Sequence, residues 1–199
     1  METRSPNTSQ RIIVVRHGET EWSREKRHTG RSDLSLTAEG REQALALGAQ
    51  LAHLRFAAVF VSPLRRARET CELAGYAARA IVDLDLIEWD YGEYEGLTSA
   101  EIQQDRPGWS LFTDGVIGGE TIDDVAARAD RVVTRVRSVE GDVLLFGHGH
   151  QLRILTALWL DFPPAAAQHL HLATASPSTL GFEHDWTALL SWNGLSQTE

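Results

Sequence analysis

The sequence contains little cysteine, no long apolar run and less positive than negative charge. Cys71 is the single cysteine, which excludes an intrachain disulfide and a cysteine-rich zinc site. No apolar run approaches the ~20 residues that cross a bilayer, so we expect no membrane partner. The first ten residues lack the apolar segment of a signal peptide, and with the single cysteine this leads us to expect a cytoplasmic protein.

The charge balance argues against a nucleic-acid partner. The chain has 28 acidic and 19 basic residues, a formal net charge of −9 with histidine neutral. Phosphate backbones select proteins with broad basic faces, which this balance disfavours. Any site for a phosphate must therefore be local, with a few cations gathered at one place.

The apolar content is sufficient for a folded core. Hydrophobic residues make up 42% of the 199-residue chain, which excludes disorder for its bulk. The length suits one domain that buries roughly 70% of its unfolded surface. No internal repeat or linker divides the sequence, so we predict a polar N-terminal tail over 1–10 and a single domain over 11–199.

Short apolar runs alternate with segments of helical periodicity. Strands are predicted over 12–15, 57–61, 81–82 and 143–146, with a closing strand pair over 179–182 and 188–192. Helices are predicted from Thr37 to about Leu54, over 64–74, from the capping box at 98–101, and over 122–136 and 151–160. This alternation predicts an α/β fold with a single doubly wound, mainly parallel sheet and helices on both faces.

Arginine, histidine and glycine follow three of the predicted strands. Arg16, His17 and Gly18 come after the first strand, Arg65 and Arg66 shortly after the second, and the run 147–150, Gly-His-Gly-His, after the fourth. Ligands bind outside the carboxyl ends of such strands. Arginine matches phosphate oxygens bidentately, and a neutral imidazole among cations can attack phosphorus as a nucleophile.

Each of these segments also has an ordinary explanation when it is taken alone. Two arginines at a helix start usually form a solvated face, and the 147–150 run could be a loop, a satisfied histidine pair or half of a metal site. Their joint occurrence at three predicted strand ends favours a functional site.

Four segments resemble, in order, the motifs of the histidine phosphatase superfamily, also called phosphoglycerate-mutase-like. They are 16–20 (Arg-His-Gly-Glu-Thr), 62–67 (Ser-Pro-Leu-Arg-Arg-Ala), 86–96 around Glu88, and 146–149 (Phe-Gly-His-Gly). The matches cover roughly residues 11 to 192. In the second motif the phosphate ligand is the arginine immediately before the alanine, which selects Arg66 rather than Arg65.

The resemblance implies a phosphate pocket made of Arg16, His17, Arg66 and His148. His17 would accept the phosphoryl group as a phosphohistidine, Glu88 would protonate the leaving oxygen, and water would then hydrolyse the intermediate. No metal or other cofactor is implied, because the cations of the site are side chains. The histidine pairs 148/150 and 169/171 also have no cysteine partner and no obvious third ligand for zinc.

Three features favour hydrolysis over a mutase reaction. The segment 96–120 is short and contains Arg106 as its only basic residue, whereas cofactor-dependent phosphoglycerate mutases have a long basic insertion there. Ser23 stands where those mutases usually have asparagine. The runs 27–30, 88–91 and 148–153 resemble instead the sedoheptulose-1,7-bisphosphatases and small acid phosphatases of the family.

That branch implies a set of substrate contacts beyond the phosphate pocket. For Trp89 and Tyr91 the alternative is packing in the core, and for Arg153 it is a place near the start of a solvated helix. The expected contacts are Ser23, Thr29, Gly30, Glu88, Trp89, Tyr91 and Arg153.

The leading hypothesis is a metal-independent phosphatase acting on a small phosphorylated metabolite, such as a sugar phosphate or bisphosphate. The alternatives are a cofactor-dependent phosphoglycerate mutase and a non-catalytic module of the same fold that binds phosphosugars. Dimers are common in the family, so the resemblance also allows a homodimer. Because Glu88 must be protonated to act as the donor, we expect the rate to fall as pH rises above the acidic-to-neutral range.

Overall fold

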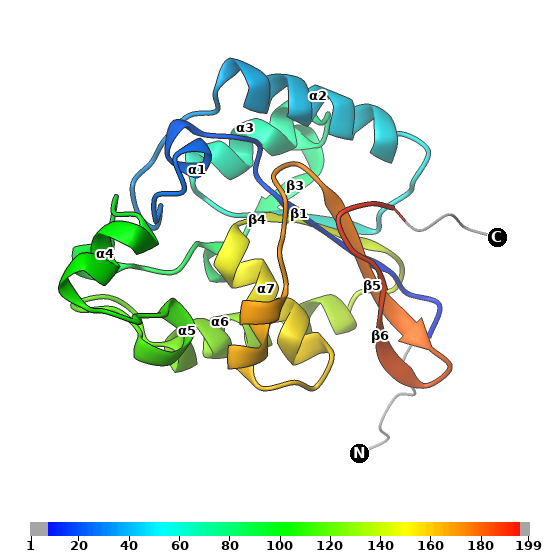
Figure 1. The fold of residues 1–199 in the computed structure, drawn as a ribbon. Coiled ribbons are helices and arrows are strands. Elements are labelled where there is room, and N and C mark those ends of the chain that lie inside the picture. The colour runs from blue at the N-terminus through cyan, green and yellow to red at the C-terminus, as the bar shows by residue number, and fades with distance from the viewer. Residues whose placement is uncertain (1–7, 196–199) are drawn as a thin grey trace.

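A six-stranded sheet forms the centre of the protein in a computed structural model, which describes residues 8–195 (Figure 1). The strand order is β3-β2-β4-β1-β5-β6. The first four strands in this order run parallel to one another, whereas β5 is antiparallel to both β1 and β6. The strands are β1 (Ile12–Arg16), β2 (Ala58–Val61), β3 (Ala80–Val82), β4 (Val143–Gly147), β5 (Pro177–Glu183) and β6 (Trp186–Ser191).

Helices cover both faces of the sheet, as predicted for a doubly wound α/β fold. Figure 1 shows α2 (Ala38–Leu51) and α3 (Arg65–Leu73) on one side, and α6 (Ile122–Arg137) and α7 (Gly149–Trp159) on the other. Short helices complete the chain: α1 (Glu21–Arg24), α4 (Ser99–Asp105), α5 (Leu111–Asp114) and the 3-10 turns η1 (Ala77–Arg79), η2 (Leu84–Leu86), η3 (Gly92–Tyr94) and η4 (Pro164–His169).

The strand β1 illustrates how two cores hold the sheet. Its side chains alternate between the faces, so Ile12 and Val14 pack in the core with α6 and α7, and Ile13 and Val15 in the core with α2 and α3. Each such side chain contributes about 1.5–3 kcal/mol when it is fully buried. The strand is therefore held from both sides, and the residues that follow it have fixed positions.

The predicted strands and main helices are confirmed, with shifts at their ends. The helix α2 begins after the Thr37 cap as predicted but ends at Leu51, three residues before the expected Leu54. The helix α7 begins at Gly149, two residues earlier than predicted. The short helices α1 and α5 and the four 3-10 turns were not predicted, because segments of three to six residues show no helical period.

The structure describes only residues 8–10 of the predicted N-terminal tail. Its residues 1–7 lie outside the described part of the chain. Gln10, its last residue, is not part of a polar tail, because it is 3% exposed. The Gln10 amide donates hydrogen bonds to the carbonyl of Val136 in the last turn of α6 and to those of Val139 and Gly141, which follow this helix.

Over residues 8–195, the structure contains no helix that is both long and apolar enough to cross a bilayer.

Candidate active site

The carboxyl ends of three parallel strands bring the predicted phosphate residues together. Arg16 at the end of β1 pairs in register with Gly147 at the end of β4, and Val61 of β2 pairs with Phe146. The backbone N–H of His17 donates to the Gly147 carbonyl at 3.0 Å. The rings of His17 and His148, 131 positions apart in the sequence, consequently lie with centroids 5.3 Å apart.

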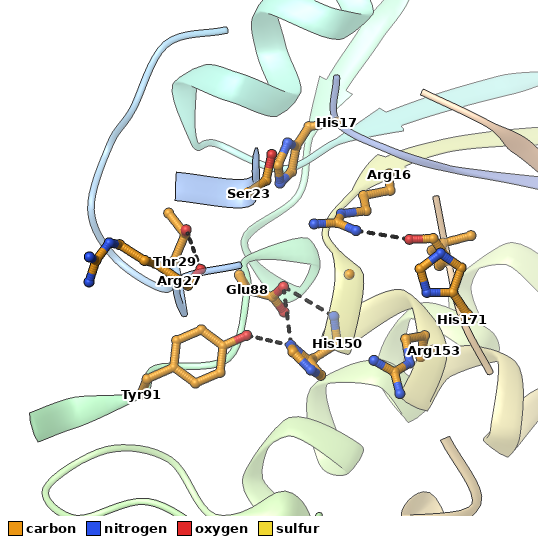
Figure 2. Close-up of a pocket in the computed structure, with 12 residues that line it drawn as sticks. Arg16, His17, Ser23, Arg27, Thr29, Glu88, Tyr91, His150, Arg153 and His171 are labelled. Atoms are coloured by element: carbon orange, nitrogen blue, oxygen red, sulfur yellow. Dashed lines mark hydrogen bonds and ion pairs between the residues drawn. The ribbon is translucent and has the colours of Figure 1, made fainter. Parts of the chain in front are cut away.

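A pocket of about 90 Å³ opens at this edge of the sheet (Figure 2). Seven of the predicted site residues line it, from both the phosphate side and the expected leaving-group side: Arg16, His17, Ser23, Thr29, Glu88, Tyr91 and Arg153. The remaining wall consists of Arg27, Gly149, His150, His171 and Leu172.

The ring of His17 is held in one tautomer. Its Nδ1 lies 2.7 Å from the carbonyl oxygen of Gly18, which can only accept a hydrogen bond, so Nδ1 carries the proton. The Gly18 N–H donates in turn to the hydroxyl of Thr70, which fixes this backbone. Burial, together with the charges of Arg66 and Arg16, lowers the pKa of His17 well below its usual value of 6.5. The ring is thus neutral, with a lone pair on Nε2.

The second histidine, His148, is fully buried beside the first. Its Nε2 lies 2.7 Å from the hydroxyl of Ser62, which also accepts the N–H of Leu64 at 3.4 Å. This arrangement favours a Ser62 hydroxyl that donates to Nε2 and a ring proton on Nδ1. That Nδ1 finds no hydrogen-bond partner within residues 8–195. Burial is the main cause that lowers the pKa of His148 well below 6.5.

Two arginines complete the phosphate side, of which Arg66 is fully buried and Arg16 is half-buried. Arg16 donates to the carbonyl of Leu172 at 2.9 Å, as drawn in Figure 2, and Arg66 donates to the carbonyls of Ser32, Thr29 and Gly30. Burial lowers the pKa of both guanidinium groups from its usual value, but arginine remains charged in proteins. The Nε atoms of both side chains have no partner among the described residues.

Buried donors without partners require a compensating acceptor, because an unpaired one costs about 1–3 kcal/mol. Here three such atoms, Arg16 Nε, Arg66 Nε and His148 Nδ1, accompany a neutral histidine at one sheet edge. Gly149 borders this arrangement, and a Cβ built on it would lie in van der Waals contact with Arg16, 3.4 Å from its Nε. The set of donors suits a phosphoryl group with three oxygens.

Glu88 lines the same pocket and is bound to the start of α7. Its carboxylate accepts the backbone N–H groups of Gln151 at 2.9 Å, His150 at 3.1 Å and Trp89 at 2.9 Å. The first two are unsatisfied donors in the first turn of α7, so Glu88 caps this helix. Oε1 accepts two of the three hydrogen bonds, which leaves Oε2 with the capacity to carry a proton.

Tyr91 and His150 form a hydrogen-bonded pair next to Glu88. The Tyr91 hydroxyl lies 2.6 Å from Nδ1 of His150, which is itself 4.0 Å from Glu88 Oε2. Burial raises the pKa of Tyr91 well above 10 and lowers that of His150 well below 6.5. The phenol therefore keeps its proton and donates a hydrogen bond to Nδ1 of the neutral ring (Figure 2).

The two outer arginines of the pocket wall already have protein partners. Arg27 binds Glu25, Glu101 and the carbonyl of Gly96. Arg153 donates through Nε and Nη2 to the carbonyls of Ala167 and Gln168. Its guanidinium carbon lies 5.0 Å from the ring centre of Phe112. Its remaining nitrogen, Nη1, is the group left to face a ligand.

Two predicted contact residues, Trp89 and Gly30, do not belong to the described pocket wall. Trp89 is fully buried and its indole N–H donates to the carbonyl of Glu120, so it packs in the core. The N–H of Gly30 donates to Glu95, and a Cβ at Gly30 would lie 2.5 Å from the Trp89 carbonyl oxygen. Arg66 and His148 also lie behind the wall, adjacent to His17.

Sequence reasoning missed Arg27, His150, His171 and Leu172 as pocket residues. The 148–153 run contains His150, and its position in the motif was the available signal. His171 and Leu172 lie in an irregular segment between η4 and β5 and have no pattern that predicts their place. Among residues 8–195, no three His, Cys, Asp or Glu side chains are grouped as a metal site would require.

The sequence model of the family described as "Histidine phosphatase superfamily (branch 1)" matches residues 12–194 of this chain. The chain belongs to this superfamily. Its motif order and the pocket at the carboxyl edge of the parallel strands agree with that membership.

Curated relatives within the histidine phosphatase superfamily have phosphatase and mutase names. The chain is 40% identical over 178 residues to an acid phosphatase of Mycobacterium tuberculosis, covering 87% of each chain. It is 35% identical over 187 residues to the sedoheptulose 1,7-bisphosphatase of Saccharomyces cerevisiae, covering 77% of this chain and 69% of the relative. It is 30% identical over 188 residues to a Salmonella paratyphi A protein named for phosphoglycerate mutase GpmB, covering 89% and 87%.

Solved structures of histidine phosphatases confirm the fold. An open-reading-frame product of Mycobacterium tuberculosis has a TM-score of 0.89 at 38% identity, covering 94% of this chain and 99% of its own. The mycobacterial glucosyl-3-phosphoglycerate phosphatase, solved in complex with VO3, has a TM-score of 0.83 at 32% identity, covering 93% and 99%. The predicted α/β class is therefore correct.

Proposed function

We propose that this protein hydrolyses small phosphomonoesters through a phosphohistidine on His17, with Glu88 as the proton donor. The observation that carries the proposal is the state of His17: a neutral ring with Nδ1 bound to a carbonyl and Nε2 free, beside buried and unpaired N–H donors. Phosphatase names among the relatives agree with this chemistry.

In the first step the Nε2 lone pair of His17 attacks phosphorus. The bond between phosphorus and the leaving oxygen breaks, and Glu88 gives its proton to that oxygen, which leaves as an alcohol. Arg16, Arg66 and His148 stabilise the charge on the three remaining phosphoryl oxygens. Proton donation at this stage is typically worth ~10²–10⁴-fold in rate.

In the second step water attacks the phosphohistidine. The Glu88 carboxylate accepts a proton from the water, the new phosphorus–oxygen bond forms and the phosphorus–nitrogen bond breaks. Inorganic phosphate leaves, and both His17 and Glu88 return to their starting protonation states. The side chains supply every cation in this scheme, so it includes no metal or other cofactor.

The size and lining of the pocket favour a small substrate. A cavity of about 90 Å³ accepts a phosphoryl group and a short alcohol moiety. Ser23, Thr29, Tyr91 and the free nitrogen of Arg153 would contact that moiety, because they line the wall beyond the phosphate side. We therefore propose a small phosphorylated metabolite as the ligand.

A mutase reaction finds less support, although one relative has that name. A mutase must hold a bisphosphate while it reorients, which requires further cations. Arg106, the only basic residue between Gly96 and Glu120, instead donates to the hydroxyl of Tyr94. Efficient interconversion of 2- and 3-phosphoglycerate would support the mutase alternative.

The test is phosphate release from a panel of sugar phosphates, sugar bisphosphates, phosphoglycerates and p-nitrophenyl phosphate. We expect release that does not change on addition of a chelator and that His17→Ala reduces to background. His53→Ala, at an exposed position, is the matched control. An acid-labile phosphohistidine should form on the unaltered protein and on His53→Ala, but not on His17→Ala. Undiminished turnover by His17→Ala would contradict the proposal, and binding of phosphosugars without turnover would indicate a non-catalytic module.

A further inference from the structure

The segment that carries Glu88 has no regular secondary structure of its own. Glu88 lies between the short turns η2 and η3, yet it is only 4% exposed. Proton donation requires the carboxyl oxygen within about 2.6–3.2 Å of the leaving oxygen. Something outside this segment must therefore hold its backbone in place.

Arg128 of α6 supplies that support. It is 9% exposed and uses all five of its N–H groups. Nε and Nη2 bind the two carboxylate oxygens of Glu120 at 2.8 and 2.9 Å. Nη1 donates to the carbonyls of Asp85 at 3.0 Å and Ile87 at 2.8 Å, and Nη2 also lies 3.5 Å from the carbonyl oxygen of Glu88.

Glu120 holds the other side of the same segment. Its carboxylate accepts the N–H of Asp90 at 2.9 Å, and its carbonyl accepts the indole N–H of Trp89 at 2.8 Å. Its own N–H donates to the Asp90 carbonyl at 3.0 Å. The backbones approach so closely here that a Cβ on Gly119 would lie 2.2 Å from the Asp90 carbonyl oxygen. Residues 85–90 are thus bound on both sides of Glu88.

Arg128 and Glu120 lie outside the described pocket wall, and their polar groups bind each other and the backbone of residues 85–90. We propose that the Arg128–Glu120 ion pair is a positioning device for the proton donor, acting on the departure of the leaving group and not on phosphate binding. This inference rests on the proposed function, because it assigns a role to Glu88 as the donor. Arginine is required at position 128 because lysine cannot bind a carboxylate and three carbonyls in one plane.

The test compares an alkyl phosphate with p-nitrophenyl phosphate, whose leaving group needs little protonation. We expect Arg128→Met to reduce kcat toward the alkyl phosphate about 10- to 100-fold, because small misplacement of a catalytic group has effects of this size. Its kcat toward p-nitrophenyl phosphate should change far less. Arg128→Lys should not restore the alkyl activity. Glu120→Gln provides the same comparison if Arg128→Met does not fold.

A double-mutant cycle separates positioning of Glu88 from general damage. In the Glu88→Gln background, Arg128→Met should cause no further loss on the alkyl phosphate, since the group it positions is already absent. Arg131→Met is the matched control. Arg131 is on the same helix and binds Asp85 at 2.6 Å, but it is half exposed, and within the described part of the chain its hydrogen bonds go to Asp85 and Ala127.

The outcomes distinguish the inference from the proposed function. If Glu88→Gln itself shows no selective loss on the alkyl phosphate, Glu88 is not the proton donor. The positioning role of the Arg128–Glu120 pair is then contradicted as well. If Glu88→Gln is selective but Arg128→Met reduces activity equally on both substrates, only the inference is overturned. Additive losses in the double mutant, or an Arg131→Met variant with the same selectivity, would also overturn it.

Discussion

The two ends of the pocket are held by different means. The phosphate end consists of Arg16 and His17 at the end of β1, His148 directly after β4 and Arg66 in α3. Both strands are packed between two cores. The donor end consists of Glu88 on an irregular segment, held by polar contacts from the start of α7 and from Arg128. Position is thus maintained by apolar packing at one end and by hydrogen bonds at the other.

This difference separates two parts of the proposed reaction. The phosphate end would act on every phosphomonoester, since all of them share the phosphoryl group. The donor end would matter only when the leaving oxygen needs a proton. Changes at the two ends should therefore be distinguishable by the leaving group of the substrate.

The largest contrast is expected from Glu88→Gln. The amide cannot give a proton to the leaving oxygen, so turnover of an alkyl phosphate should fall by ~10²–10⁴-fold. Turnover of p-nitrophenyl phosphate should fall much less. Steady-state assays on both substrates measure the ratio, and equal losses would remove the distinction between the ends.

A change at the phosphate end should lack this selectivity. Arg66→Met removes a buried cation beside His17, and we expect a loss of ~10²–10³-fold, the scale reported for single charge-stabilising donors. The loss should be similar for alkyl and p-nitrophenyl phosphates. Arg65→Met, the preceding and exposed residue of α3, is the matched control. A loss confined to the alkyl substrate would contradict the assignment.

Acid should destabilise the fold through buried histidines, including His28 beside the donor end. Burial lowers the pKa of His28 to about 4 from 6.5, and its ring packs 4.8 Å from that of Tyr91. The unfolded chain therefore binds a proton that the folded chain excludes, so the stability from this group is full above pH 6.5 and is lost as pH falls toward 4. The difference between the two pKa values corresponds to about 3 kcal/mol of unfolding free energy.

His28→Phe keeps a ring but removes this titration. When the pH falls from 7 to 5, the free energy of unfolding should decrease in both proteins. The decrease should be about 2 kcal/mol smaller in His28→Phe than in the unaltered protein. Urea unfolding at the two pH values measures both decreases. The same decrease in both proteins would show that His28 does not exclude the proton.

The smallest effect is expected from Tyr91→Phe. It removes the hydroxyl that donates to His150, a hydrogen bond worth about 0.5–1.5 kcal/mol. We expect KM to rise a few-fold with kcat nearly unchanged, because Tyr91 contacts the substrate body in this scheme. A large loss of kcat would instead indicate that Tyr91 takes part in proton transfer, and the donor end would then contain two proton-transfer residues, Glu88 and Tyr91.

The phosphate end was predictable because its residues are local to buried strands. A run such as Ile12 to Val15 identifies a strand by itself, and the position of the following Arg16 and His17 then depends on the parallel topology alone. Caps at Thr37 and Thr98 were predictable for the same reason, since each depends on residues within one turn.

The donor end was only partly predictable because irregular backbone has no period from which side-chain directions can be read. Trp89 and Tyr91 are two positions apart, yet Trp89 packs in the core and Tyr91 lines the pocket. Arg128 resembles an ordinary exposed cation in the sequence, although it borders the apolar stripe of α6. Its partner carbonyls lie about forty positions away, a separation that no local pattern reports.

The first turn of α7 joins the two ends. His148 is the residue that precedes this helix, and the next N–H groups of the same turn bind Glu88. A displacement of the turn would carry His148 and Glu88 together, so their separation stays fixed. In the proposed reaction this fixed separation would align the phosphoryl group and the leaving oxygen of the same ester bond.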